Sequence, residues 1–340
     1  MKIIDLEAHF YTENYIKYLR SRNEEPREIL REKDIQLMMA PDVWAPRSFK
    51  LEDRLLDMGE DRIRDMDEAG VDIQVLSLAV PGCEQFDPAD GEAMARETND
   101  ELAEVIRKYP DRYVGLAALA PQNPENAAQE LERAVTKLGM KGAKLNSHCR
   151  NEYLDDEKYW PVFEAAERLD VPVYLHPTVP SSSILKGYGE YGFPLAGPPH
   201  GFAADTALHI MRLIYSGLFD KYPGLKIVLG HLGEGIPFWM YRIDFYWLKP
   251  WVAGEIRPKI ENKPSHYVNK NFLFTSSGMH YLPAFVCAYM AMGADMIAFG
   301  ADHPFETSKE SLESLGILPI CDADKEKFYH LNAEKILHIN

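Results

Sequence analysis

The sequence predicts an α/β protein built as a (β/α)8 TIM barrel, with insertions after strands 1 and 5. Eight short apolar segments follow one another along the chain, and longer amphipathic stretches with helical spacing separate most of them. Polar side chains of the kinds that bind metals come at the ends of these segments, which is where the active sites of such barrels lie. An open, doubly wound sheet is the alternative that the strand pattern alone leaves open.

The predicted strands are nearly continuous in apolar residues, which is typical of a sheet that helices cover on both faces. The helical stretch before the second strand, RIRDMDEAG, ends at Gly70, a residue suited to close a helix. The predicted strands are, in chain order, Lys2–Leu6, Val71–Val80, Arg112–Ala120, Met140–Asn146, Val171–His176, Leu225–Leu229, Asn271–Ser276 and Asp295–Gly300.

Two segments are longer than a minimal barrel needs. Phe10 to about Asp53 follows strand one and carries many aromatics, and Pro177–Phe202 follows strand five and is rich in Ser, Gly and Pro. Long connections in a compact domain are usually functional or disordered. Because the sequence shows no linker and no internal repeat, we expect one barrel domain over residues 1–340. The aromatic insertion also suggests a homodimer or homotetramer, since an exposed aromatic surface favours association.

Composition and charge exclude several classes of function. The 340 residues are 46% apolar and 11% aromatic, which supports a large folded core. The formal net charge of −16 repels phosphate backbones, so no nucleic-acid partner is expected. No apolar run approaches the ~20 residues that span a bilayer. Without a signal peptide or a CxxC pair among its four cysteines, the chain is expected to be cytoplasmic, with no membrane partner.

Four residues of metal-ligand type fall at or near strand ends. Glu7 and His9 are two positions apart, a spacing that puts both side chains on one face of a strand. His176 ends strand five, and Asp302 follows strand eight. Each has a plain structural alternative when taken singly, such as a helix N-cap for Asp302. Their shared position on one rim of the barrel favours a mononuclear site for zinc, manganese or iron.

Further polar residues reach the same rim. His231 lies in LGHLGEG, and Glu234 is close enough to orient its imidazole if a helix begins there. Lys144 lies in GAKLN, and we expect it to form a salt bridge to a carboxylate of the barrel rather than to carry chemistry. Asn146, Ser276 and Ser277 also lie at strand ends, and the weaker candidates are His148, His200, His280 and His303.

These motifs and their spacings resemble the amidohydrolase superfamily. Within it they resemble the decarboxylase branch, which includes aminocarboxymuconate-semialdehyde, dihydroxybenzoate, γ-resorcylate and 5-carboxyvanillate decarboxylases. The resemblance spans nearly the whole chain and rests on DLEAHF, RIRDMDEAGVDIQVLSL, NSHCRNEYLDDEKYWPVFEAAERLDVPVYLHP, the long segment from YGFPLAG to FWMYRID, and FGADHPFE. The ExH start, where many superfamily members have HxH, favours the decarboxylases over the binuclear hydrolases.

The resemblance implies a site and a reaction. The metal ligands that it implies are Glu7, His9, His176 and Asp302, holding one divalent ion per chain, zinc or manganese. It assigns His231 as the catalytic histidine and Glu234 as its partner. The implied enzyme is a carboxy-lyase that decarboxylates a small ortho-hydroxylated aromatic carboxylate without oxidation, and Asp302 protonates the ring carbon. Arg242, in MYRID, is a candidate clamp for the substrate carboxylate.

Two other functions share the same residues. In a metal-dependent hydrolase, Asp302 or His231 would activate a water that attacks a lactone or an amide. In a non-catalytic binding protein, the metal would only stabilise the barrel. The sequence favours an enzyme over the latter, because it offers a candidate residue for every catalytic role.

Overall fold

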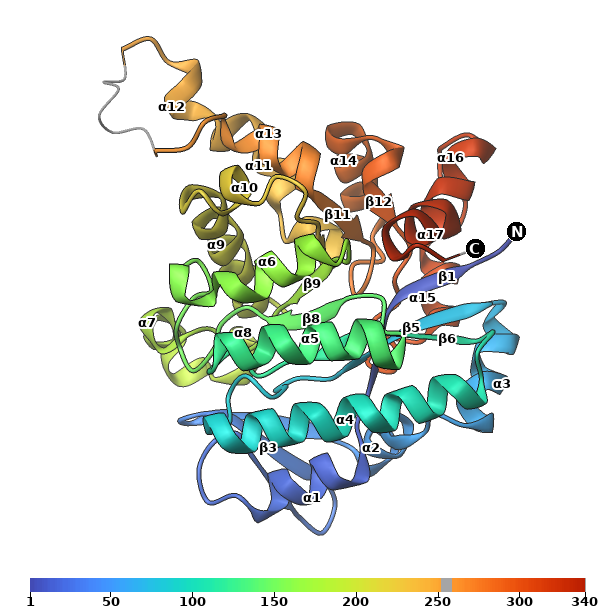
Figure 1. The fold of residues 1–340 in the computed structure, drawn as a ribbon. Helices are drawn as coiled ribbons and strands as arrows, with labels where there is room; N and C mark the ends of the chain where they lie inside the picture. Colours follow the sequence, from blue (N-terminus) through green and yellow to red (C-terminus); the bar gives the residue numbers. More distant parts are fainter. Residues whose placement is uncertain (252–258, 340) are drawn as a thin grey trace.

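The computed structural model describes residues 1–251 and 259–339. In this part of the chain, parallel strands form a central sheet and helices pack around it (Figure 1). The strands of the central sheet are β1 (Ile4–Phe10), β5 (Ile73–Leu78), β6 (Tyr113–Gly115), β7 (Ala117–Ala118), β8 (Ala143–Asn146), β9 (Val173–His176), β10 (Ile227–Leu229), β11 (Phe272–Thr275) and β12 (Ile297–Ala298). They match the eight predicted segments, the third of which is divided into β6 and β7.

Backbone hydrogen bonds close this sheet into a barrel. β1, β5 and β6 pair with one another, and β7 to β12 pair in a second series. The two series join at Leu116, between β6 and β7, whose amide donates to the carbonyl of Leu76 on β5. The amide of the next residue, Ala117, donates to the carbonyl of Gly142, just before β8. At the other seam, the amide of Leu6 on β1 donates to the carbonyl of Phe299 after β12 at 3.0 Å. The predicted barrel is confirmed.

The first strand contains a β-bulge that aims a carboxylate into the barrel. β1 ends at Phe10, beyond the predicted Leu6, and all of its residues are buried. Its register with β5 shifts between Asp5 and Ala8, so that Leu6 and Glu7 together oppose a single residue. A bulge of this kind interrupts the alternation of side chains between the two faces. Leu6 and Glu7 therefore both face the interior, although they are adjacent in sequence.

The barrel interior changes from apolar to polar along the strands. Its apolar end is one buried cluster that includes Ile4, Leu6, Val75, Leu116, Tyr174, Val228, Leu273 and Ala298. Glu7 and His9 follow these residues on β1, and His176 follows Tyr174 on β9. The residues suited to chemistry thus lie at the carboxyl ends of the strands, as this fold requires of an active site.

The helices form where apolar residues recur every three or four positions. In α5 (Pro124–Leu138), Ala127, Leu131 and Ala134 are buried, and Gly139, with a φ of 79°, ends the helix. The other helices that follow barrel strands are α3 (Glu60–Ala69), α4 (Pro88–Lys108), α6 (Trp160–Arg168), α9 (Gly201–Tyr215), α10 (Leu218–Lys221), α11 (Ile236–Ile243), α12 (Phe245–Leu248), α13 (Pro264–Asn271), α14 (Leu282–Met292), α15 (Ser308–Leu315), α16 (Asp322–Glu326) and α17 (Asn332–Leu337). None of the helices in the described residues has the length and apolar character needed to cross a bilayer.

The insertion after strand one forms a small antiparallel sheet. Helix α1 (Glu13–Ser21) precedes β2 (Arg27–Leu30), β3 (Ile35–Ala40) and β4 (Val43–Arg47), and α2 (Phe49–Leu56) follows them. Two of the insertion's aromatic side chains, Tyr11 and Tyr15, are buried with their rings stacked 5.1 Å apart. The structure thus places these aromatics in a core rather than on the surface that the sequence suggested.

The insertion after strand five consists of short helices. These are α7 (Ser182–Leu185), the 3₁₀ helix η2 (Lys186–Tyr191) and α8 (Phe193–Ala196). α8 contacts β4, so the two insertions meet beside the barrel.

Candidate metal centre and active site

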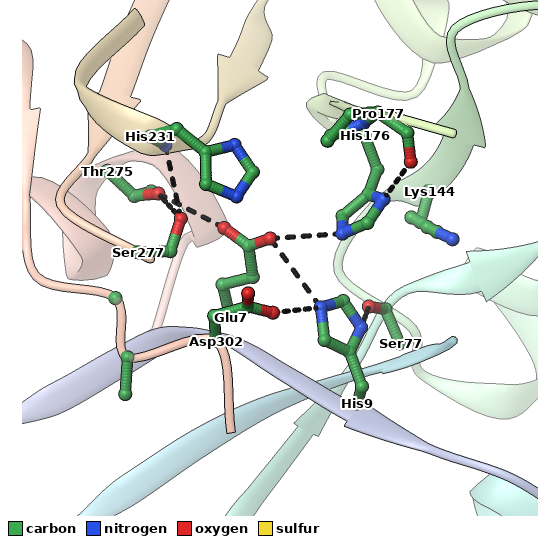
Figure 2. Close-up of polar contacts among 12 residues, drawn as sticks. Glu7, His9, Ser77, Lys144, His176, Pro177, His231, Thr275, Ser277 and Asp302 are labelled. Atoms are coloured by element: carbon green, nitrogen blue, oxygen red, sulfur yellow. Dashed lines mark hydrogen bonds and ion pairs between the residues drawn. The ribbon is translucent and has the colours of Figure 1, made fainter. Parts of the chain in front are cut away.

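Four predicted ligand residues converge inside the mouth of the barrel (Figure 2). One ligand-type atom from each of Glu7, His9, His176 and Asp302 lies within 4.8 Å of all the others. His9 Nε2 is 3.0 Å from Asp302 Oδ1 and 3.5 Å from Glu7 Oε1. His176 Nε2 is 3.2 Å from the same Glu7 oxygen. Two imidazoles and two carboxylates therefore surround a single point.

The atoms that face this point lack hydrogen-bond partners. Glu7 Oε1, His9 Nε2 and Asp302 Oδ1 are each buried without one. Buried polar atoms are nearly always hydrogen-bonded, and a group of unpartnered atoms needs an explanation. A divalent cation at their centre would satisfy all of them. Mixed nitrogen and oxygen donors suit zinc, manganese or iron, so the residues fit one metal ion.

The second nitrogen of each imidazole is held by a neighbour. His176 Nδ1 lies 2.6 Å from the carbonyl oxygen of Pro177. Because a carbonyl only accepts, Nδ1 carries the hydrogen and Nε2 keeps its lone pair. His9 Nδ1 lies 3.2 Å from the Ser77 hydroxyl, which can accept in the same way. Such outer contacts fix the ring orientation of metal-binding histidines.

Glu7 is held by residues that were not predicted from the sequence. The hydroxyl of Tyr174 donates to Glu7 Oε2, and that of Thr275 does so at 3.3 Å, which leaves Oε1 free for the centre. Burial raises the pKa of Glu7, but the adjacent imidazoles of His176 and His9 outweigh burial and place this pKa well below its usual value. Tyr174 lies two residues before His176 on a strand, so the spacing does contain a signal for its inward position.

Asp302 differs from the other three in backbone and exposure. Its φ is 71°, a left-handed conformation that is uncommon for residues other than glycine. Its amide donates to the carbonyl of Glu7 at 3.0 Å, which ties it to β1. Its side chain is 18% exposed, whereas those of Glu7 and His176 are 1% and 6% exposed. Asp302 is thus the member of the set that faces the open mouth.

His231 and Glu234 form a close pair beside this cluster. His231 Nδ1 lies 2.6 Å from Glu234 Oε1. Their contact does not depend on an α-helix, because both residues have left-handed backbones, with φ of 54° and 52°, and α11 starts at Ile236. The tight turn brings the two side chains together instead. Burial lowers the pKa of His231, but the charge of Glu234 and the hydrogen bond to it dominate and raise this pKa to about 10.

A glycine allows His231 to approach the metal ligands. Gly278 has a φ of +58°, and a Cβ at this position would lie 2.9 Å from His231 Cδ2 and 3.4 Å from Asp302 Oδ2. A side chain at position 278 would therefore push on both residues. The His231 and His176 ring centroids are 6.3 Å apart. His231 thus borders the same space that Asp302 faces.

The remaining candidates take other positions. Arg242 lies on α11 as an exposed residue, with its guanidinium 4.8 Å from the centroid of the Phe245 ring, and the structure does not bring it into the cluster. A role as carboxylate clamp stays a prediction. The salt bridge expected for Lys144 is absent from the described residues, and its ammonium donates to the carbonyl of Leu78. His303 lines a small pocket with Arg62, and none of the four cluster residues lines that pocket.

Comparison with known proteins decides the family. The amidohydrolase family profile matches residues 4–339. The chain belongs to the amidohydrolase family. This amidohydrolase is 40% identical over 298 residues to γ-resorcylate decarboxylase from Polaromonas sp. (strain JS666), an alignment that covers 86% of this chain and 90% of that protein.

Solved structures agree with this assignment. A dihydroxybenzoic acid decarboxylase from Polaromonas sp. JS666, with bound manganese and the inhibitor 2-nitroresorcinol, matches this amidohydrolase with a TM-score of 0.87 and 37% identity, covering 99% of this chain and 97% of that chain. 5-Carboxyvanillate decarboxylase from Sphingomonas paucimobilis matches with a TM-score of 0.90 and 33% identity, covering 100% and 99%. The predicted resemblance to the decarboxylase branch is confirmed, and carboxy-lyases of this branch are among the relatives of this chain.

Proposed function

We propose that this amidohydrolase is a metal-dependent, non-oxidative decarboxylase of an ortho-hydroxylated benzoate. The observation that carries the proposal is the placement of Asp302. It is both a member of the four-residue cluster and the one whose side chain is partly exposed toward the mouth. A carboxyl group in that position can contact the metal ion and the substrate ring at once. We further propose that Glu7, His9, His176 and Asp302 are the ligands, in one domain that spans the chain.

Each residue of the site has a task in this reaction. A bound divalent ion would polarise the substrate carboxylate and ortho oxygen and hold them in place. The Asp302 carboxyl group delivers a proton to the ring carbon that bears the carboxylate. As the ring carbon takes this proton, the ortho oxygen donates electron density to the ring and becomes a ketone-like group. The bond to the carboxylate then breaks, carbon dioxide leaves, and the ortho oxygen becomes a phenolate again. The electron pair of that bond restores the aromatic ring.

His231 acts on the substrate oxygens in this scheme. Its Nδ1 is bound by Glu234, so Nε2 carries the second hydrogen of a charged imidazolium. That hydrogen is placed to bind the ortho oxygen or the carboxylate and to stabilise negative charge there. Glu234 keeps the ring oriented and balances its charge. A hydrolase built on the same residues would need an activated water in place of a protonated Asp302.

We predict that decarboxylation in D2O places deuterium at the ring carbon that carried the carboxylate, because the proton on Asp302 exchanges with solvent. The assay follows carbon dioxide release and product NMR for 2-hydroxy-, 2,3-, 2,4- and 2,6-dihydroxybenzoate and 5-carboxyvanillate, on manganese- and zinc-loaded protein, with chelated protein as control. Lactones run in parallel. Lactone or amide cleavage without carbon dioxide from any aromatic acid would replace this proposal with a hydrolase.

We also propose that the enzyme is a homodimer or homotetramer in the cytoplasm. Large aromatic side chains are exposed on α11 and in the segments that follow α12 and β11. They are Phe238 (77%), Trp239 (42%), Tyr241 (68%), Trp251 (72%) and Tyr281 (63%). A second copy of the chain would cover this aromatic surface. Large exposed apolar side chains on a soluble protein favour association, and these aromatics, rather than the insertion after strand one, support the proposal.

The double substitution Phe238→Glu and Tyr241→Glu is expected to shift the protein to monomer at micromolar concentration, because it places charges inside the contact. Light scattering coupled to gel filtration measures the mass. Phe49→Glu, at an exposed residue of the first insertion (41% exposed), is the matched control and should leave the mass unchanged. A wild-type protein that is monomeric throughout would contradict the proposal.

A further inference from the structure

Lys144 lies inside the barrel beside the four-residue cluster of Glu7, His9, His176 and Asp302. It is on β8, in register with Tyr174 of β9. Residues in register on neighbouring parallel strands project to the same face of the sheet, and Tyr174 faces inward, where its hydroxyl reaches Glu7. Figure 2 shows Lys144 next to His176, across the site from Thr275. The proposed mechanism gives this residue no task.

The ammonium group of Lys144 is buried without a counter-ion. Lys144 is 3% exposed, and its Nζ donates to the carbonyl oxygen of Leu78 at 2.9 Å. No carboxylate lies within 4 Å of Nζ in the described residues. An ammonium has three N–H donors, so the hydrogen bond to Leu78 leaves two of them for other acceptors. A buried charge without a partner is costly, which calls for a stabilising ligand.

The neighbouring carboxylates do not fill this role. Glu84 is the buried acid whose charge acts most on Lys144. Its two oxygens accept hydrogen bonds from the backbone and side-chain nitrogens of Asn146, at 2.8 and 3.0 Å. Glu7 accepts a hydrogen bond from Tyr174, and its other oxygen faces the centre of the four-residue cluster. Burial lowers the pKa of Lys144 to about 8, although both carboxylates oppose this.

We propose that Lys144 is a substrate-binding residue that pairs with an anionic oxygen of the aromatic substrate, its carboxylate or its ortho phenolate. The inference rests on the proposed function. Lys144 lies beside His176 and His231 lies on the side of Thr275 (Figure 2), so two positive groups would then flank the substrate. This arrangement would select anionic rings over neutral ones of the same shape, because only an anion supplies the missing counter-charge.

The test compares ligand binding to manganese-loaded full-length protein carrying Lys144→Met with the wild type. The ligands are benzoate, which offers a carboxylate alone, 2-nitroresorcinol, which offers a phenolate and a nitro group in place of the carboxylate, and neutral resorcinol. We expect Lys144→Met to weaken binding of at least one anionic ring by about tenfold or more, the usual worth of a charged hydrogen bond. Binding of resorcinol and of manganese should stay within about twofold of wild type. Weaker binding of benzoate assigns Lys144 to the carboxylate, and a loss confined to 2-nitroresorcinol assigns it to the ortho phenolate.

Lys137→Met, at an exposed lysine of α5, is the matched control and should change nothing. Lys144→Gln, whose amide can still donate to the carbonyl of Leu78, serves if the methionine variant does not fold, with the same loss expected. Unchanged affinity for both anions overturns the inference and leaves the proposed function standing. Loss of manganese affinity also overturns it, since Lys144 would then act on the metal centre. If the wild-type protein binds neither anion, both the inference and the proposed function are overturned.

Discussion

Asp302→Asn is expected to lower kcat for the best aromatic acid by about a hundredfold to ten-thousandfold, the usual contribution of a positioned acid. Asparagine keeps the size of the side chain and one oxygen that can face the cluster, but it cannot deliver a proton to the ring. Because Asp302 also has a left-handed backbone, asparagine is the residue that best preserves its conformation. Manganese should therefore remain partly bound in this variant.

The measurement separates the two roles of Asp302. Metal analysis of the purified variant gives occupancy, and single-turnover kinetics with deuterium incorporation gives the protonation step. Asp295→Asn, an exposed aspartate that pairs with Lys327, is the control for a charge change near strand eight. If the Asp302 variant turned over near the wild-type rate with metal bound, another acid would have to protonate the ring.

The fold could be predicted because its pattern is local. Each barrel strand is a short, nearly continuous apolar run. The helices can be recognised by the helical spacing of their apolar residues and by glycines at their ends, such as Gly70 and Gly139. The predicted ends of the strands were less accurate than the predicted strands themselves. β1 extends to Phe10 because both of its faces are buried, and a polar pair such as Glu7 and His9 does not look like a strand interior from composition alone.

The four-residue cluster could be predicted because residues of metal-ligand type end or extend strands of one barrel. What the sequence does not encode locally is backbone geometry. The bulge that turns Glu7 inward depends on pairing with β5, and the turn that joins His231 to Glu234 depends on left-handed residues rather than a helix. The partners of long side chains are also non-local. The carbonyl of Leu78, 66 residues away, takes the place of the carboxylate expected for Lys144.

His176→Ala is expected to lower manganese affinity by at least about a hundredfold, since losing an outer partner of a ligand already costs tenfold to a hundredfold. It should abolish decarboxylation while leaving the barrel folded. His176 supplies Nε2 at 3.2 Å from Glu7 Oε1, and the proline carbonyl that orients its ring cannot replace that nitrogen. With one imidazole gone, Glu7, His9 and Asp302 would hold the ion through three donors in place of four.

The decisive readout is the rise in melting temperature when manganese is added to metal-free protein. An ion that binds only the folded state stabilises it in proportion to the logarithm of its concentration over Kd. The wild type and His266→Ala, at an exposed histidine of α13, should both show the rise, and His176→Ala should show little or none. Because the metal-free melting temperatures are measured in the same experiment, a folding defect is distinguished from loss of the ion. Full manganese occupancy in folded His176→Ala would remove His176 from the ligand set and leave the ion to the three remaining residues.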